Sequence, residues 1–156
     1  MASVINIDTS GFEKDLQKIK DSLSDKESLL RPVCIELSGI MNNRIHDEGR
    51  ASDGGEIGQY SVPYLRMRQA FNHTRDRKVI LVLSRKLSNS WGAFATDKGY
   101  AVGFTDSAAT EGVTGLKKIK FAEENFGKKI GDMTKEEQTY AFERLNELST
   151  EIIGRS

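Results

Sequence analysis

Cysteine, proline and tryptophan are scarce in this sequence, with one, two and one of them in 156 residues. The single cysteine, Cys34, excludes a disulfide within the chain and fits a reducing compartment. No apolar run approaches the roughly 18 residues that a membrane-spanning helix needs. No basic N-terminus leads into an apolar segment of the kind found in secretory signals. We therefore expect a protein of the cytoplasm that makes no membrane contact.

The chain also lacks net charge, because 23 Lys and Arg balance 23 Asp and Glu. This balance argues against a generally cationic protein that coats DNA. A hydrophobic fraction of 37% and a charged fraction of 29% are typical of a folded, soluble protein. The length fits one domain, residues 1–156, with a single core.

The charges are nevertheless segregated along the chain. Residues 64–86 hold seven basic residues against one acid, Asp76. Residues 132–151 hold six acids against Lys135 and Arg144. A basic face and an acidic face could serve head-to-tail self-association. Ordinary solvated faces are the alternative explanation.

Apolar spacing predicts a pair of helices, or one kinked helix, in the N-terminal part. The apolar face of the first, which would begin near Thr9 and Ser10, consists of Phe12, Leu16, Ile19 and Leu23. The apolar stripe of the second consists of Leu29, Leu30, Val33, Leu37, Ile40, Met41 and Ile45. Pro32 fits near the start of the second helix, because the first turn needs no backbone N–H. We therefore expect the break between Ser24 and Arg31. Cys34, within the second helix, is expected to be a small core residue rather than a nucleophile.

A polar, glycine-rich segment, HDEGRASDGGEIGQYS (46–61), follows and has no apolar period, which predicts a loop. Residues 62–76 fit either a short helix or an extended arm. We expect an extended loop or arm at about 47–76. Its first part, 47–63, would be disordered in the free chain and ordered on a neighbouring protein. A plain surface loop without a partner is the alternative.

Apolar, β-branched residues predict strands in the middle of the chain. Residues 78–84, KVILVLS, predict a strand buried on both faces. Residues 91–96 and 100–105 flank Asp97, Lys98 and Gly99, and this pattern predicts a β-hairpin. Together these segments predict a small antiparallel sheet of three or four strands.

Two more helices are predicted at the C-terminal end. The first would run from Thr114 to Asn125 and stop at Gly127. Its apolar side consists of Leu116, Ile119, Ala122 and Phe126. The second opens with Thr134-Lys-Glu-Glu137, a capping box. Its apolar side consists of Ala141, Leu145, Leu148 and Ile152. The fold class is therefore α+β: an N-terminal helical pair, a small antiparallel sheet and two C-terminal helices.

The motifs of common catalytic and metal sites are missing. His46-Asp-Glu48 is not HExxH, and SDGGE (52–56) lacks the alternating oxygen ligands of a calcium loop. There is no Walker loop, GxSxG or GxGxxG. We therefore predict no catalytic residue, no metal ligand and no cofactor. A nuclease site built on Asp53, Glu56 and a later lysine is the enzymatic alternative, although a precise site prefers rigid elements to a loop.

The order of several short motifs resembles a known family. These motifs are RIHDEG (44–49), DGGEIGQYS (53–61), ILVLSRKLSNSWGAFA (80–95), AVGFT (101–105), ENFG (124–127) and MTKEE (133–137). In this order they are similar to the tail-completion, or virion morphogenesis, family of small phage neck proteins. Arg85-Lys86 stands where the family usually has a glycine before the leucine, and MTKEE stands where it commonly has Pro-Arg-Pro-Phe.

The resemblance implies a structural role without catalysis. Copies would form a hexameric or dodecameric ring, assembled in the host cytoplasm and retained in the virion neck. The ring would join the portal connector or head-completion protein to the tail terminator or tail tube protein. Double-stranded DNA would pass through without specific binding. A tail terminator ring is one alternative, and a nucleic-acid-binding accessory protein that uses the basic segment 66–86 is another.

This role predicts two sets of site residues. The expected contacts with a neighbouring subunit or partner are Asp53, Glu56, Tyr60, Tyr64, Arg66, Arg68, Arg75 and Arg77. The expected channel-facing residues, near DNA, are Arg66, Arg68 and Lys98.

Overall fold

The computed structural model describes residues 24–70, 76–81, 86–97, 99–104 and 115–155, together with residues 14, 17, 18, 20 and 21. Among these residues the elements are α2 (Lys26–His46), α3 (Val62–Ala70), α4 (Lys86–Asn89), β1 (Trp91–Thr96), β2 (Gly99–Phe104), α5 (Gly115–Phe126) and α6 (Lys135–Arg155). The described part of the chain is thus mixed helix and strand, with five helices and a two-stranded antiparallel sheet.

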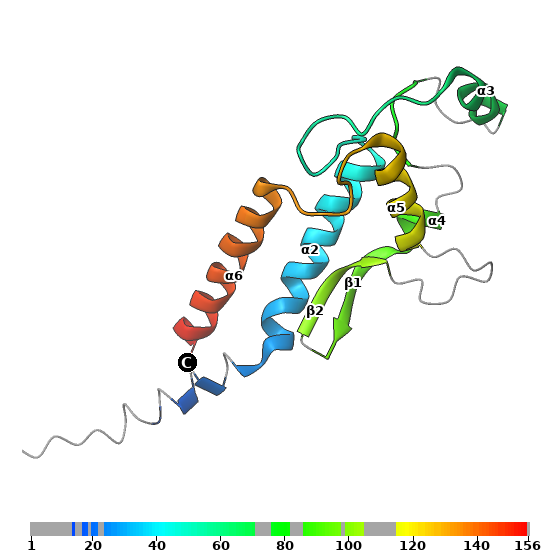
Figure 1. Ribbon diagram of the computed structural model, residues 1–156. Helices are drawn as coiled ribbons and strands as arrows, with labels where there is room; N and C mark the ends of the chain where they lie inside the picture. The colour runs from blue at the N-terminus through cyan, green and yellow to red at the C-terminus, as the bar shows by residue number, and fades with distance from the viewer. Residues whose placement is uncertain are drawn as a thin grey trace, which may run out of the picture.

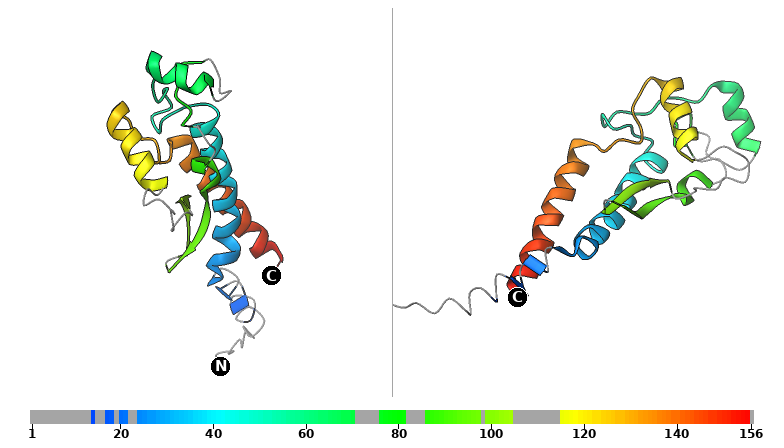
Figure 2. Two further views of the ribbon diagram at one scale, coloured as in Figure 1. Left: turned by 90° about the vertical axis from the view of Figure 1, so that its right-hand side faces the viewer. Right: turned by 60° about the horizontal axis from the view of Figure 1, so that its bottom comes forward.

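Helix α2 is the spine of an elongated molecule. Helix α6 runs antiparallel along one side of α2, and the β1–β2 hairpin packs along another side (Figure 1). Helix α5 lies near the C-terminal end of α2, and α3 projects at one extremity of the molecule (Figures 1 and 2). Helices α5 and α6 therefore lie on opposite sides of the spine, and each turns one face to solvent.

The break predicted between Ser24 and Arg31 is confirmed at Asp25. Asp25 has φ −75° and ψ 78°, and its side chain accepts a hydrogen bond from the backbone N–H of Ser28, which caps α2. This cap starts the helix well before Pro32, which lies inside α2 and not near its start as predicted. Four apolar residues of the predicted first helix lie outside the described residues: Phe12, Leu16, Ile19 and Leu23.

The predicted hairpin is confirmed. Trp91 pairs with Phe104 and Thr96 pairs with Gly99, and Asp97 follows β1 in a turn. The Trp91 and Phe104 rings meet edge to face with centroids 4.8 Å apart. At the other end of the hairpin, the Tyr100 hydroxyl donates to Glu27 over 3.1 Å. Both strands of the hairpin also contact α2.

The sheet of three or four strands is not confirmed. Residues 82–85 lie outside the described residues, and the described sheet contains β1 and β2 only. Lys78 forms a single antiparallel bridge with Gln59 instead. Leu81 has a φ of 49°, which interrupts the extended conformation that a strand needs. Val79 is fully buried. The apolar pattern of residues 78–84 therefore predicted a core residue correctly, but the described part of this segment does not pair with the sheet.

The loop predicted as a free arm packs into the core. Ala51, Ile57 and Tyr60 are buried in the same cluster as Ile45 and Val79. Backbone bonds close the loop on itself, since Ile57 N–H donates to the Gly49 carbonyl and Ala51 N–H donates to the Gly55 carbonyl. Burial of an isoleucine side chain contributes about 2 kcal/mol, so the packing of Ile57 favours this closed loop within a single chain. Residues 62–76, left open between helix and arm, form α3 over 62–70, and 71–75 lie outside the described residues.

Both C-terminal helices are confirmed. Helix α5 ends at Phe126 and is followed by Gly127, whose φ of 65° suits the predicted glycine stop. The capping box of α6 forms as predicted: Thr134 Oγ1 accepts from Glu137 N–H over 3.1 Å, and a Glu137 carboxylate oxygen accepts from Thr134 N–H over 2.7 Å. Leu116, predicted on the apolar side of α5, is exposed. The buried residue in this turn of α5 is Gly115, whose backbone packs against the Phe104 ring.

Candidate functional site

Segments far apart in the sequence meet at one junction, next to the C-terminal end of α2. Arg44 is at its centre. Its Nε donates to a Glu137 carboxylate oxygen over 2.6 Å, and 8% and 4% of the two side chains are exposed. Its Nη atoms donate to the carbonyls of Arg50, Ile130 and Asp132 over 2.9 to 3.2 Å. One guanidinium therefore joins α2, the loop that follows it, the α5–α6 connection and the start of α6.

A second group of contacts ties the loop after α2 to the α5–α6 connection. The backbone N–H and the hydroxyl of Ser52 both donate to the Lys129 carbonyl, over 2.9 and 2.8 Å. Gly58 lies against the Phe126 ring, where an added Cβ would come within 2.6 Å of a ring carbon. Four of the sequence motifs, RIHDEG, DGGEIGQYS, ENFG and MTKEE, thus belong to one packed unit, which we call the Arg44 junction (44–61 with 124–137).

Asp53 and Glu56, both predicted to contact a partner, lie on the exposed edge of the Arg44 junction. The Asp53 carboxylate accepts a hydrogen bond from Gly55 N–H over 2.8 Å and lies 3.3 Å from Lys128 Nζ. These contacts lower the pKa of Asp53, the Gly55 bond having the larger effect. The backbone of Glu56 pairs with that of Arg50. Asp53 and Glu56 thus belong to a hydrogen-bonded turn, and both side chains are exposed to solvent.

Tyr60, Tyr64 and Arg68 stack on one another instead of facing a partner. The Arg68 guanidinium lies over the Tyr60 ring, 4.4 Å from its centroid, and the two tyrosine rings are 5.1 Å apart. Arg68 is 1% exposed and Tyr60 is 7% exposed. This burial removes Arg68 and Tyr60 from the surface on which a channel or subunit contact would form. These three residues are spaced four positions apart in the sequence. That spacing could have indicated that they lie on one side of α3 and of the residues just before it.

The remaining predicted site residues are divided between the surface and the undescribed part of the chain. Arg66 is exposed on α3. Arg77 is exposed too, and its Nε donates to the Tyr60 carbonyl over 3.3 Å, which helps to hold α3 in place. Arg75 and Lys98 lie outside the described residues. Within the described residues, the basic segment therefore presents separate cations rather than a continuous basic face.

Two reactive side chains have packing roles. His46 is buried, with Nδ1 3.4 Å from the Ile80 carbonyl oxygen, and burial lowers its pKa. Cys34 is half-buried in a groove between β2 and α6, beside Leu37 and Met41. Burial raises the pKa of the Cys34 thiol, which disfavours the nucleophilic thiolate. This agrees with the expectation that Cys34 packs rather than reacts.

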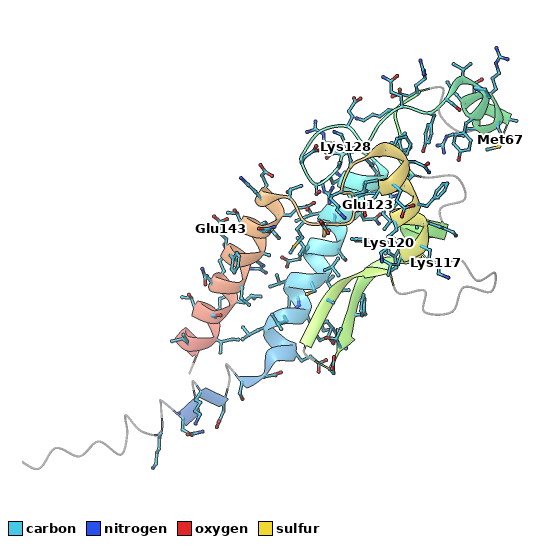
Figure 3. The ribbon with its side chains drawn as sticks, viewed as in Figure 1. Met67, Lys117, Lys120, Glu123, Lys128 and Glu143 are labelled. Carbon is cyan, nitrogen blue, oxygen red and sulfur yellow. The ribbon has the colours of Figure 1, made fainter. Side chains whose placement is uncertain are left out.

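Sequence reasoning missed two exposed faces, one on each side of the spine. Phe142 on α6 is 70% exposed and Phe121 on α5 is 67% exposed. The exposed Glu143 is next to Phe142 in α6, and the exposed Lys117 and Lys120 lie within one turn of Phe121 in α5. Figure 3 labels the three charged residues. The sequence held a signal for both faces: helical spacing places each phenylalanine outside the apolar side of its own helix.

The described residues contain no group of three or more His, Cys, Asp or Glu side chains placed to hold a metal ion. Among the described helices, none has the length and apolar character to cross a membrane. No family model, no curated protein and no solved structure matches the chain.

Proposed function

We propose that this chain is a structural protein of the phage head–tail neck. Copies would form a ring that joins the connector or head-completion ring to the tail and lets DNA pass, without catalysis. The observation that carries the proposal is the Arg44 junction. There RIHDEG meets MTKEE through Arg44 and Glu137, and DGGEIGQYS meets ENFG through Gly58 and Phe126. These contacts make the four motifs one packed unit, which supports treating them together as a single pattern.

The distribution of apolar surface supports a building-block role. Phe121 and Phe142 are each about two-thirds exposed or more, and they lie on α5 and α6, on opposite sides of the spine. Aromatic side chains are enriched at protein–protein contacts, where they serve as anchors. A subunit with one such place on each side fits an assembly in which every copy has two neighbours.

The described basic residues give less support to a nucleic-acid-binding role. Arg68 is buried on Tyr60, and Arg77 is engaged with the Tyr60 carbonyl. A DNA-binding surface needs several exposed cations that follow the phosphate backbone. For the channel of a ring, the exposed Arg66 is the remaining described candidate of the predicted set, and we expect no specific contact with DNA from it.

The proposal is tested in phage particles made by a host that carries the gene. We expect mass spectrometry to find the chain in purified particles, and electron microscopy to place it as a ring between head and tail. Deletion of the gene is expected to leave DNA-filled heads and separate tails, and a plasmid copy should restore joining. Joined, infectious particles made without the chain, or particles that do not contain it, would show that the proposal is wrong.

A further inference from the structure

We propose that copies of this chain bind head to tail through two oppositely charged helix faces. The acidic face is the outer side of α6, formed by Phe142, Glu143, Asn146, Glu147 and Thr150. The lysine face is the outer side of α5, formed by Leu116, Lys117, Lys120 and Phe121. The occupant of each face would be the other face on a second copy of the chain. The inference deepens the proposed function, because a ring needs such a contact, but its test uses the purified protein alone.

The acidic face is the side of α6 that α2 does not cover. Helix α6 holds α2 through its other side, where Tyr140 and Arg144 both bind Glu36, over 2.8 and 3.0 Å. Arg144 also pairs with Glu147 over 3.0 Å, so the negative charge of the acidic face comes mainly from Glu143. Phe142 and Glu143 point away from this contact and are exposed. An exposed phenyl ring next to a carboxylate combines an apolar anchor with a negative charge, the combination expected of a contact that is both tight and oriented.

The lysine face is the side of α5 that the core does not cover. Ile119 and Ala122 point inward and are buried, which fixes the rotation of α5. The opposite side then presents Lys120 and Phe121 to solvent. Like the acidic face, this face combines an exposed phenyl ring with charges. Its charges are lysines in the first two turns of the helix, and the exposed Glu124 follows one turn after Lys120.

The two faces match each other better than either matches itself. A contact of α6 with α6 would bring carboxylates together, and a contact of α5 with α5 would bring lysines together, which is unfavourable. Contact of α6 with α5 pairs opposite charges and lets Phe142 and Phe121 share one apolar centre. Because the faces lie on opposite sides of the spine, one copy can use both at once (Figures 2 and 3). Such a heterologous contact repeats into a closed ring or a filament.

This assignment changes the basic partner of the acidic helix. The sequence favoured residues 64–86, but Arg68 of that segment is buried. Helix α5 instead offers exposed lysines in consecutive turns of one rigid element. Specific contacts are held more accurately by helices than by separate cations on a loop.

A charge-swap experiment tests the proposal. Sedimentation of the purified wild-type chain at several concentrations and salt levels is expected to show self-association that weakens with salt. Lys120→Glu and Glu143→Lys should each weaken association at least about tenfold, because each brings like charges together. The double variant, and an equimolar mixture of the two single variants, should regain association, because every contact then pairs opposite charges again. Arg31→Glu, an exposed charge reversal on α2, is the matched control and should behave as wild type.

Several outcomes would overturn the inference. One is a wild-type chain that stays monomeric at its highest soluble concentration. Another is a pair of single variants that associate as wild type does, or a double variant that does not recover while circular dichroism shows it folded. A third is retention of duplex DNA at low salt that Lys120→Glu abolishes, since the lysine face would then serve phosphate. Recovery in the double variant, together with absence of the chain from particles, would contradict the proposed function and leave this contact in place.

Discussion

Arg44 and Glu137 form a buried ion pair that joins the end of α2 to the start of α6. The Nε to carboxylate distance is 2.6 Å, and the other Glu137 oxygen accepts from the Thr134 N–H that opens α6. The same carboxylate therefore caps one helix and anchors another. A second Arg–Glu pair, Arg144 with Glu36, joins the same two helices at 3.0 Å but is far more exposed. The two pairs differ mainly in burial, which makes them a natural comparison.

Glu137→Gln is expected to destabilise the fold strongly. It leaves the Arg44 guanidinium buried without its counter-charge, and removal of one partner of a buried pair costs about 3–5 kcal/mol. Glu36→Gln, at the more exposed pair, should have a much smaller effect, because solvent screens that interaction. Urea unfolding followed by circular dichroism measures both. Equal effects of the two substitutions would mean that the Arg44 junction does not carry the stability assigned to it.

Gly49→Ala is expected to destabilise the Arg44 junction for two reasons. Gly49 has a φ of 63°, and an added Cβ would meet the Val79 carbonyl oxygen. We expect a loss of more than about 2 kcal/mol. Gly54→Ala is the control for backbone strain alone, since its φ is 79° but nothing lies within 4 Å of the added Cβ. That variant should lose about 1 kcal/mol. Equal losses in urea unfolding would show that Gly49 is not closely packed.

Local patterns predicted the parts of the fold that neighbouring residues decide. The capping box at Thr134 and Glu137, the stop at Gly127 and the β1–β2 hairpin each depend on residues a few positions apart, and all three formed. The Arg44–Glu137 pair spans 93 positions, and no local period connects such distant residues. The capping box was predicted, but its second use as the counter-charge of Arg44 was not.

The candidate site shows where residue type misleads. Tyr60 and Arg68 were predicted to contact a partner because they lie in the expected arm (47–63) and in the basic segment (64–86). The Tyr60 ring buries the guanidinium of Arg68 instead. Phe121 and Phe142 belonged to neither the predicted apolar sides nor the predicted site residues, and both are exposed. Which side of a helix is covered depends on distant segments, so only tertiary structure decides these four residues.

Tyr60→Phe is expected to loosen the attachment of α3. The Tyr60 hydroxyl accepts a hydrogen bond from Leu81 N–H over 3.1 Å, and the phenyl ring has no replacement acceptor. Loss of an acceptor for a buried or half-buried N–H costs about 1–2 kcal/mol. Tyr64→Phe is the matched control, because the neighbouring ring is half-exposed, and its change should stay within about 0.5 kcal/mol. Thermal unfolding of both variants and of wild type measures these changes in stability. A larger loss of stability for Tyr64→Phe than for Tyr60→Phe would contradict the role given to the Tyr60 hydroxyl.

The stability of the chain is expected to fall as the pH drops below about 6.5 because of His46. Burial is the main influence on this side chain and lowers its pKa below the ordinary 6.5, against smaller opposing effects of the Ile80 carbonyl and Asp47. The unfolded chain therefore binds a proton at a pH where the folded chain does not. Protonation then favours unfolding, so the stabilisation present above pH 6.5 is lost as the pH falls toward the folded-state pKa.

The measurement is the free energy of unfolding in urea at about pH 7.5 and about pH 5.5, a window in which exposed carboxylates stay ionised. Wild type should be less stable at the lower pH, and His46→Gln should remove most of that difference. The same substitution at His73, the other histidine of the chain, identifies which residue is responsible. If His46→Gln keeps the wild-type difference, or His73→Gln alone abolishes it, then the burial of a neutral His46 does not control stability in this range. If His46→Gln flattens the profile, the neutral imidazole next to the Ile80 carbonyl is part of what holds α2 to residues 78–81.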